Sequence, residues 1–90
     1  MKVGVIHRIS DPDGAQSQGQ SLFEPHEGVE LVQFIPSEDF TAATCIWEAE
    51  SVDAVRELVD PTLGETSAQT YFAVNAEQAV GLPQAAAKVA

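Results

Sequence analysis

The sequence predicts one α+β domain, in which a four-stranded antiparallel sheet carries two helices on one face. Its length of 90 residues is too short for two hydrophobic cores. Strand-like and helix-like segments follow in the order strand, helix, strand, strand, helix, strand. The strand-like segments are apolar on both faces, whereas two helices can cover only one face of a sheet. We therefore expect a second copy of the chain to cover the other face.

The first strand is expected at residues 2–9, where β-branched side chains are frequent and a turn cluster follows at residues 10–14. A short helix is expected at residues 15–24, because alanine and glutamine favour it. Gly19 opposes this helix by about 1 kcal/mol relative to alanine. Pro25 should end it.

Residues 29–35 and 41–48 are expected to form the second and third strands. The turn residues 36–39 lie between them, so the two strands should pair as a hairpin. Alternation along the third strand places Cys45 and Trp47 on the same face.

The second helix should begin after Ser51, a good N-cap residue, because an apolar stripe with helical spacing follows it. The Asp60-Pro61 pair should either end this helix or cap a further short turn through Leu63. The last strand is expected at residues 68–74, with a short helix at 76–80.

Residues 1–83 should form the domain, and the alanine-rich residues 84–90 should form a flexible C-terminal tail. The element order predicts a ferredoxin-like βαββαβ domain. Right-handed crossovers put both of its helices on one face of the sheet. Two such sheets packed face to face form a dimeric α/β barrel, which can enclose a small ligand. We expect a homodimer of this kind.

The composition excludes several partners. A net charge of −10 opposes binding to nucleic acid and to anionic membrane surfaces. The sequence has no apolar tract of membrane-spanning length and no signal-peptide pattern. Its single cysteine, Cys45, cannot form an intrachain disulfide. We therefore expect a soluble cytoplasmic protein. Glycines are too dispersed for a nucleotide-binding loop, so no nucleotide cofactor is expected.

His7 is the first candidate for chemistry, because an imidazole inside an apolar cavity can act as a general base or as a metal ligand. The alternative is a buried histidine whose nitrogens are bonded within the core. We expect Trp47 and Tyr71 to share a face with Cys45, where they are candidate walls of a ligand site, or ordinary core residues. Cys45 is a candidate ligand contact or a small buried hydrophobe.

Two further side chains are candidates for binding. Arg8 lies on the strand face opposite His7, where it could pair with Glu48 or bind an anionic ligand. His26 lies in the Glu-Pro-His-Glu loop and could hold a divalent metal together with carboxylates, or simply be solvated.

Three stretches together are similar to a known family: Val5-Ile6-His7-Arg8, Cys45-Ile46-Trp47-Glu48-Ala49, and Ser51-Val52-Asp53-Ala54-Val55-Arg56. They resemble the small ferredoxin-like domains of unknown function that include a nickel-binding protein from actinobacteria, over residues 2–82 by order of elements. The resemblance implies an α/β-barrel homodimer and, for that branch, a bound divalent metal such as nickel. The wider superfamily includes cofactor-free monooxygenases and muconolactone isomerases, so the fold does not select an activity.

Three functions follow as hypotheses. In the first, the two sheets enclose a small organic molecule, with His7 as the polar group and Trp47 and Tyr71 as walls, for binding alone or for proton transfer or cofactor-free oxygenation. In the second, the protein binds a metal without catalysis, through His7 or His26. In the third, it is a dimeric interaction protein without a ligand.

Overall fold

The computed structural model describes residues 1–82 and has the predicted α+β architecture. The strands are β1 (Lys2–Ile9), β2 (Val29–Pro36), β3 (Ala42–Ala49) and β4 (Ser67–Ala73). They form one antiparallel sheet in the order β2-β3-β1-β4, as in ferredoxin-like domains. The expectation of a flexible tail at 84–90 lies outside the described residues.

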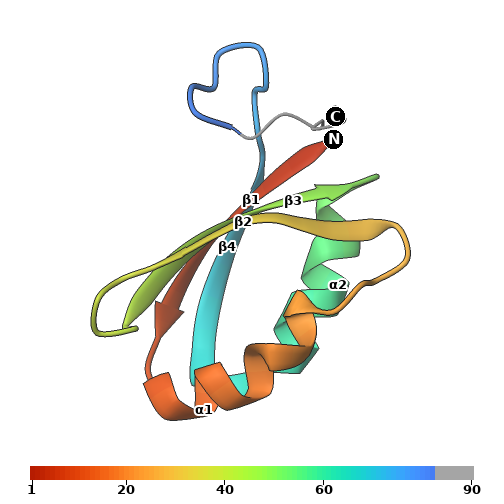
Figure 1. Ribbon diagram of the computed structural model, residues 1–90. Coiled ribbons are helices and arrows are strands. Elements are labelled where there is room, and N and C mark those ends of the chain that lie inside the picture. Colours follow the sequence, from red (N-terminus) through yellow and green to blue (C-terminus); the bar gives the residue numbers. More distant parts are fainter. Residues whose placement is uncertain (83–90) are drawn as a thin grey trace.

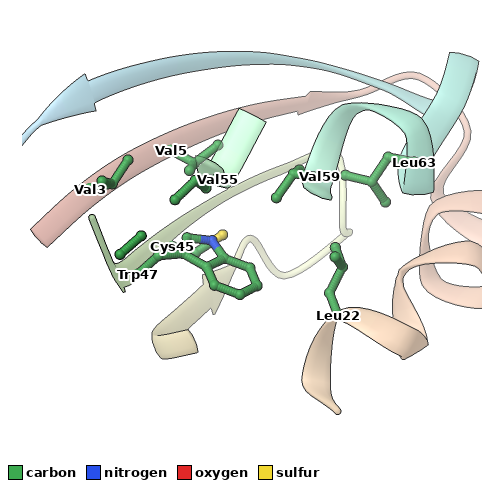
Figure 2. Packing of buried hydrophobic residues seen from close by; sticks show 9 residues of the cluster. Val3, Val5, Leu22, Cys45, Trp47, Val55, Val59 and Leu63 are labelled. Atoms are coloured by element: carbon green, nitrogen blue, oxygen red, sulfur yellow. The ribbon is translucent and has the colours of Figure 1, made fainter. Parts of the chain in front are cut away.

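Both helices cover the same face of the sheet, as Figure 1 shows. They are α1 (Pro12–Gln18), continued by the 3₁₀ segment η1 (Gly19–Phe23), and α2 (Val52–Leu63), which ends in the short 3₁₀ turn η2 (Gly64–Thr66). The core lies between this face and the helices. Figure 2 shows Val55, Val59 and Leu63 of α2 directed toward the sheet, where they meet Val5 and Trp47. We call the other side of the sheet the open face.

The first helix begins earlier than predicted. Asp11 is its N-cap and accepts a hydrogen bond from the backbone N–H of Gly14, while Pro12 occupies the first turn. Residues 12–14, which the sequence predicts as part of a turn, therefore form the start of the helix. At Gly19 the α-helix changes to a 3₁₀ helix, which carries Leu22 into the core.

The second helix begins as predicted, because the Ser51 hydroxyl accepts a hydrogen bond from the N–H of Ala54. Of the two expectations for Asp60-Pro61, a stop at this pair is wrong, and continuation through Leu63 is confirmed. The helix continues to Leu63, whose side chain is buried in the core. Burial of Leu63 outweighs the hydrogen bond that a proline cannot donate.

The short helix expected at residues 76–80 is absent. The Asn75 side chain accepts hydrogen bonds from the N–H groups of Glu77 and Gln78, which forms a turn instead. No helix within residues 1–82 is both long enough and apolar enough to cross a lipid bilayer.

Strand β2 contains a bulge. Leu31 pairs with Trp47 and Gln33 pairs with Ile46, so Val32 is an extra residue on its strand. The bulge changes the alternation, so Leu31 and Phe34 both lie on the helix-covered face, opposite Trp47 and Cys45. Regular alternation would place these two side chains on opposite faces.

Candidate functional site

A pocket of about 470 Å³ lies between the α1–η1 segment and the helix-covered face of the sheet. Its walls are mainly apolar and come from η1, β2 and the end of α2, including Leu22, Phe34 and Leu63. The sheet contributes polar groups from His7 on β1, Cys45 and Trp47 on β3 and Ser67 on β4, and the α1–η1 segment adds Gln16 and Gln20. The volume of this pocket lies within the range that small-molecule sites in proteins have.

Three aromatic rings form one side of the pocket. Phe23 and Phe34 meet edge to face with centroids 5.2 Å apart, and Phe40 lies 6.1 Å from Phe34. Phe40 belongs to the β2–β3 hairpin and has φ = 62°, the only positive φ of a non-glycine residue within residues 1–82. This left-handed conformation is unfavourable for a side chain of that size.

His7 and Cys45 are in direct contact. The imidazole Nε2 lies 2.8 Å from the thiol Sγ, and both residues are buried. The other ring nitrogen, Nδ1, lies 3.2 Å from the side-chain oxygen of Gln69 on β4. His7 is therefore held on both sides.

The protonation of this imidazole follows from its neighbours. The Asp60 carboxylate accepts hydrogen bonds from the amide Nε2 of Gln69 at 3.0 Å and from the hydroxyl of Tyr71 at 2.6 Å. The amide nitrogen of Gln69 thus faces Asp60, and its oxygen faces His7. That oxygen accepts from Nδ1–H of His7 and from the hydroxyl of Ser67. In a neutral ring Nε2 is then the acceptor, directed at the Cys45 thiol.

Burial sets the charge states. It lowers the pKa of His7, against smaller opposing effects of the Gln69 hydrogen bond and the Asp60 charge. It raises the pKa of the Cys45 thiol to about 11, with a smaller opposing effect of the Trp47 indole. At neutral pH the pair is thus a thiol beside a neutral imidazole.

The indole nitrogen of Trp47 is the unusual polar atom of the pocket. Trp47 is only 1% exposed, and within residues 1–82 its Nε1–H makes no hydrogen bond of good geometry, although it lies near enough to the Cys45 sulfur to lower the pKa of that thiol slightly. Figure 2 shows this nitrogen on the same side as the sulfur of Cys45. A buried donor without a partner is costly, by about 1–3 kcal/mol, which a ligand acceptor would offset.

The predicted residues therefore divide into two groups. His7, Cys45 and Trp47 come together, but under the helices rather than on the open face, so their predicted placement in a cavity between two sheets is wrong. Their strands carry the bulkier apolar side chains on that face, and the helices cover it. Tyr71 shares the face but is no wall of the pocket. Its hydroxyl bonds Asp60, and its ring lies 5.0 Å from the guanidinium carbon of Arg56.

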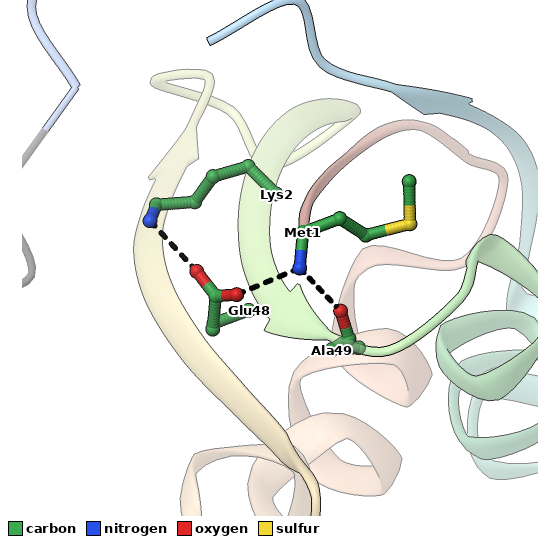
Figure 3. Close-up of polar contacts among 4 residues, drawn as sticks. All are labelled: Met1, Lys2, Glu48 and Ala49. Carbon is green, nitrogen blue, oxygen red and sulfur yellow. Dashed lines mark hydrogen bonds and ion pairs between the residues drawn. The ribbon is translucent and has the colours of Figure 1, made fainter.

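Arg8 lies on the open face and does not pair with Glu48. The register between β1 and β3 places Arg8 opposite Ala42, and Glu48 lies at the other end of β3. Glu48 instead receives Lys2 Nζ at 2.7 Å and the ammonium of Met1 at 2.8 Å, as Figure 3 shows. These partners lower the pKa of Glu48 to about 2.

His26 lies apart from the pocket, in the loop before β2. Its Nε2 lies 2.8 Å from the carbonyl oxygen of Ser21. Residues 1–82 contain no group of three or more His, Cys, Asp or Glu side chains arranged to hold a metal ion. The metal alternative, through His7 or His26, stays a prediction without a ligand set.

Sequence reasoning missed Gln69, Ser67 and Asp60. A signal existed for the first two, because alternation along β4 places them on the same face as Tyr71. No signal marked Asp60, which reaches β4 only because α2 packs against that strand.

Comparison of the chain with protein-family models, with curated proteins and with solved structures finds no match. The resemblance to the nickel-binding family stays a prediction. Function has to be inferred from the geometry of the pocket.

Proposed function

We propose that the protein binds a small, neutral, mostly apolar organic molecule in the helix-side pocket. The observation that carries this proposal is the buried indole N–H of Trp47, which makes no hydrogen bond of good geometry, in a mainly apolar and uncharged pocket. A ligand with one hydrogen-bond acceptor would satisfy that donor while its apolar part replaces water along the walls. Within the described residues, the lining contains no Asp, Glu, Lys or Arg, which favours an uncharged ligand.

The test uses two molecules of nearly the same shape, 4-phenylbutan-2-one and (3-methylbutyl)benzene. The second carries a methyl group where the first has its carbonyl oxygen. We expect the ketone to bind more tightly by roughly fivefold, which corresponds to about 1 kcal/mol for one hydrogen bond. Trp47→Phe keeps a ring but removes the donor, so it should abolish this preference. Calorimetry measures both affinities.

A second variant tests the location. Ala43 is buried in the lining, so Ala43→Leu would place a larger apolar side chain in the pocket. We expect it to fold and to lose ketone binding. Phe72→Leu, on the open face, is the matched control and should bind normally. Equal binding by wild type, Ala43→Leu and Trp47→Phe would contradict the proposal.

We further infer that two copies associate through their open faces. Two cross-strand rows occupy the centre of that face, and neither contains a charge: Ile35-Thr44-Ile6-Thr70 and Gln33-Ile46-Gly4-Phe72. Ile6, Ile35 and Phe72 remain 45%, 53% and 44% exposed. On a chain of net charge −10, the uncharged centre of this sheet face is a surface where a second copy can approach without strong repulsion. A reducing, cytoplasmic setting suits the free thiol of Cys45.

A further inference from the structure

We propose that the pocket accepts small apolar α,β-unsaturated ketones and that the Cys45 thiol adds to their β-carbon, with His7 as general base and the Trp47 N–H as donor to the carbonyl oxygen. This inference rests on the proposed function, because it names the ligand class of the same pocket. It adds a covalent step, which binding alone does not require.

The first support is the direct contact between nucleophile and base. His7 Nε2 lies 2.8 Å from Sγ of Cys45, within reach for proton transfer. The hydrogen-bond chain from Asp60 through Gln69 places the ring proton on Nδ1, so Nε2 is free to accept. A neutral imidazole is the form that can take a proton from a neutral thiol.

The second support is the Trp47 donor beside the cysteine. The N–H of Trp47 is buried, unpartnered and part of the same pocket, on the side of the Cys45 sulfur in Figure 2. A donor fixed beside a nucleophile and away from water stabilises negative charge that develops on a substrate oxygen. Conjugate addition to an enone develops its charge on the carbonyl oxygen.

The step balances without an added reagent. As the thiol proton moves to Nε2 of His7, a sulfur lone pair forms the C–S bond to the β-carbon. The π electrons of the C=C bond move to give an enolate, whose oxygen accepts from the Trp47 N–H. The proton on His7 then moves to the α-carbon and leaves a saturated thioether ketone. In the net reaction, the S–H bond of Cys45 has added across the C=C bond of the enone, and no oxidant or reductant is needed.

The walls select the class of electrophile. Apolar side chains such as Leu22, Phe34 and Leu63 surround the polar groups of the pocket. Among the described residues, 1–82, none that lines the pocket is Asp, Glu, Lys or Arg. Carboxylated or phosphorylated electrophiles would lose their hydration without gaining a partner. Uncharged aryl or alkyl enones match the pocket.

The experiment incubates the protein at pH 7 with 4-phenylbut-3-en-2-one, whose conjugated absorbance falls as the double bond is consumed. Mass spectrometry of the intact protein and of its peptides locates the adduct. We expect one adduct at Cys45, formed roughly a hundredfold faster than with N-acetylcysteine at the same pH. A rate at or below that of N-acetylcysteine would overturn the inference, because a thiol of raised pKa reacts slowly without a base.

Three variants separate the roles. His7→Gln should lose most of the rate. Trp47→Phe should slow addition to the enone by roughly tenfold or more. The same variant should slow alkylation by iodoacetamide much less, because that displacement places no new charge on an oxygen and the indole has only a small effect on the pKa of the thiol. Phe72→Leu, on the other face of the sheet, should react like wild type. If Trp47→Phe slows both reagents equally, the donor role is wrong.

Binding and addition fail in distinguishable ways. Cys45→Ser should form no adduct but should still bind the saturated 4-phenylbutan-2-one. A wild-type protein that binds the saturated ketone and never adds to the enone overturns the covalent step and leaves the proposed function standing. If wild type neither binds the saturated ketone nor reacts with the enone, both proposals fail.

Discussion

His7 and Cys45 contact each other diagonally across two strands, because His7 pairs in register with Ala43 while Cys45 pairs with Val5. The small Ala43 side chain opposite His7 leaves room for the imidazole to lean toward the thiol. The contact therefore depends on one residue that takes no part in it. It also places a titratable ring where water cannot solvate its charged form.

This burial predicts a pH dependence of stability. The pKa of His7 is lowered in the folded protein relative to its ordinary value of 6.5. The unfolded chain therefore takes up a proton first as the pH falls, and folding stability is lost below about pH 6.5. Each unit of lowering corresponds to about 1.4 kcal/mol. Asp60, Gln69, Tyr71 and Cys45 are the groups around the ring.

His7→Gln should remove this part of the pH dependence. Urea unfolding of wild type and variant at pH 7.5, 6.5 and 5.5 measures it. The stability difference between the two proteins should shift in favour of the variant as the pH falls. A difference that stays constant over this range would show that His7 does not titrate with unfolding.

Asp60 should act on the pKa of His7 from a distance. Its charge raises that pKa, and through Gln69 it orients the hydrogen bond that raises it further. Asp60→Asn should therefore lower the pKa of His7 below its value in wild type. NMR titration of the imidazole resonances measures the shift directly, and Asp53→Asn on the exposed start of α2 is the control. An unchanged or raised pKa in Asp60→Asn would contradict the orientation inferred for Gln69.

Glu48 should contribute to resistance against acid. Its pKa of about 2 lies below the ordinary 4.5, so the ionised form favours folding above pH 4.5, and this contribution is lost as the pH falls through about 2. The side chain is 42% exposed, so we expect Glu48→Gln to cost no more than about 1 kcal/mol at pH 7. Thermal unfolding at pH 7 and pH 2 should show a smaller difference at the lower pH. A difference that grows toward pH 2 would exclude the ion pair as its cause.

The open face should determine oligomeric state. Ile6 is central on that face, so Ile6→Lys places like charges against each other in a dimer and should yield monomers. Glu57→Lys introduces a lysine on the exposed side of α2 and should leave the dimer intact. Light scattering after size-exclusion chromatography gives both masses. A wild-type protein that is monomeric at all concentrations would refute the association.

Much of this fold could be predicted from the sequence, because its strands follow regular alternation and Ser51 is a strong N-cap. The alternation of side chains along β1 also predicted that Ile6 and Arg8 lie on the face opposite His7. It could not predict which face the helices cover, since both faces of each strand carry apolar side chains. That choice depends on how well Val5 and Trp47 pack against α2.

The bulge at Val32 was beyond sequence reasoning for a related reason. An extra residue leaves no signal of its own in an apolar strand, yet it reverses the alternation for the rest of β2. Phe34 reaches the pocket only because of it. The sequence therefore predicted His7, Cys45 and Trp47 as site residues. It did not predict the aromatic side of the pocket, which Phe23, Phe34 and Phe40 form.

Phe40 has a further consequence. Glycine would adopt φ = 62° without steric conflict. Phenylalanine in this backbone conformation destabilises the hairpin by about 1 kcal/mol or more relative to glycine. Replacement by glycine would thus relax the hairpin and at the same time remove the ring that lines the pocket beside Phe34. The backbone strain of the hairpin and the aromatic wall of the pocket are thus joined in a single residue.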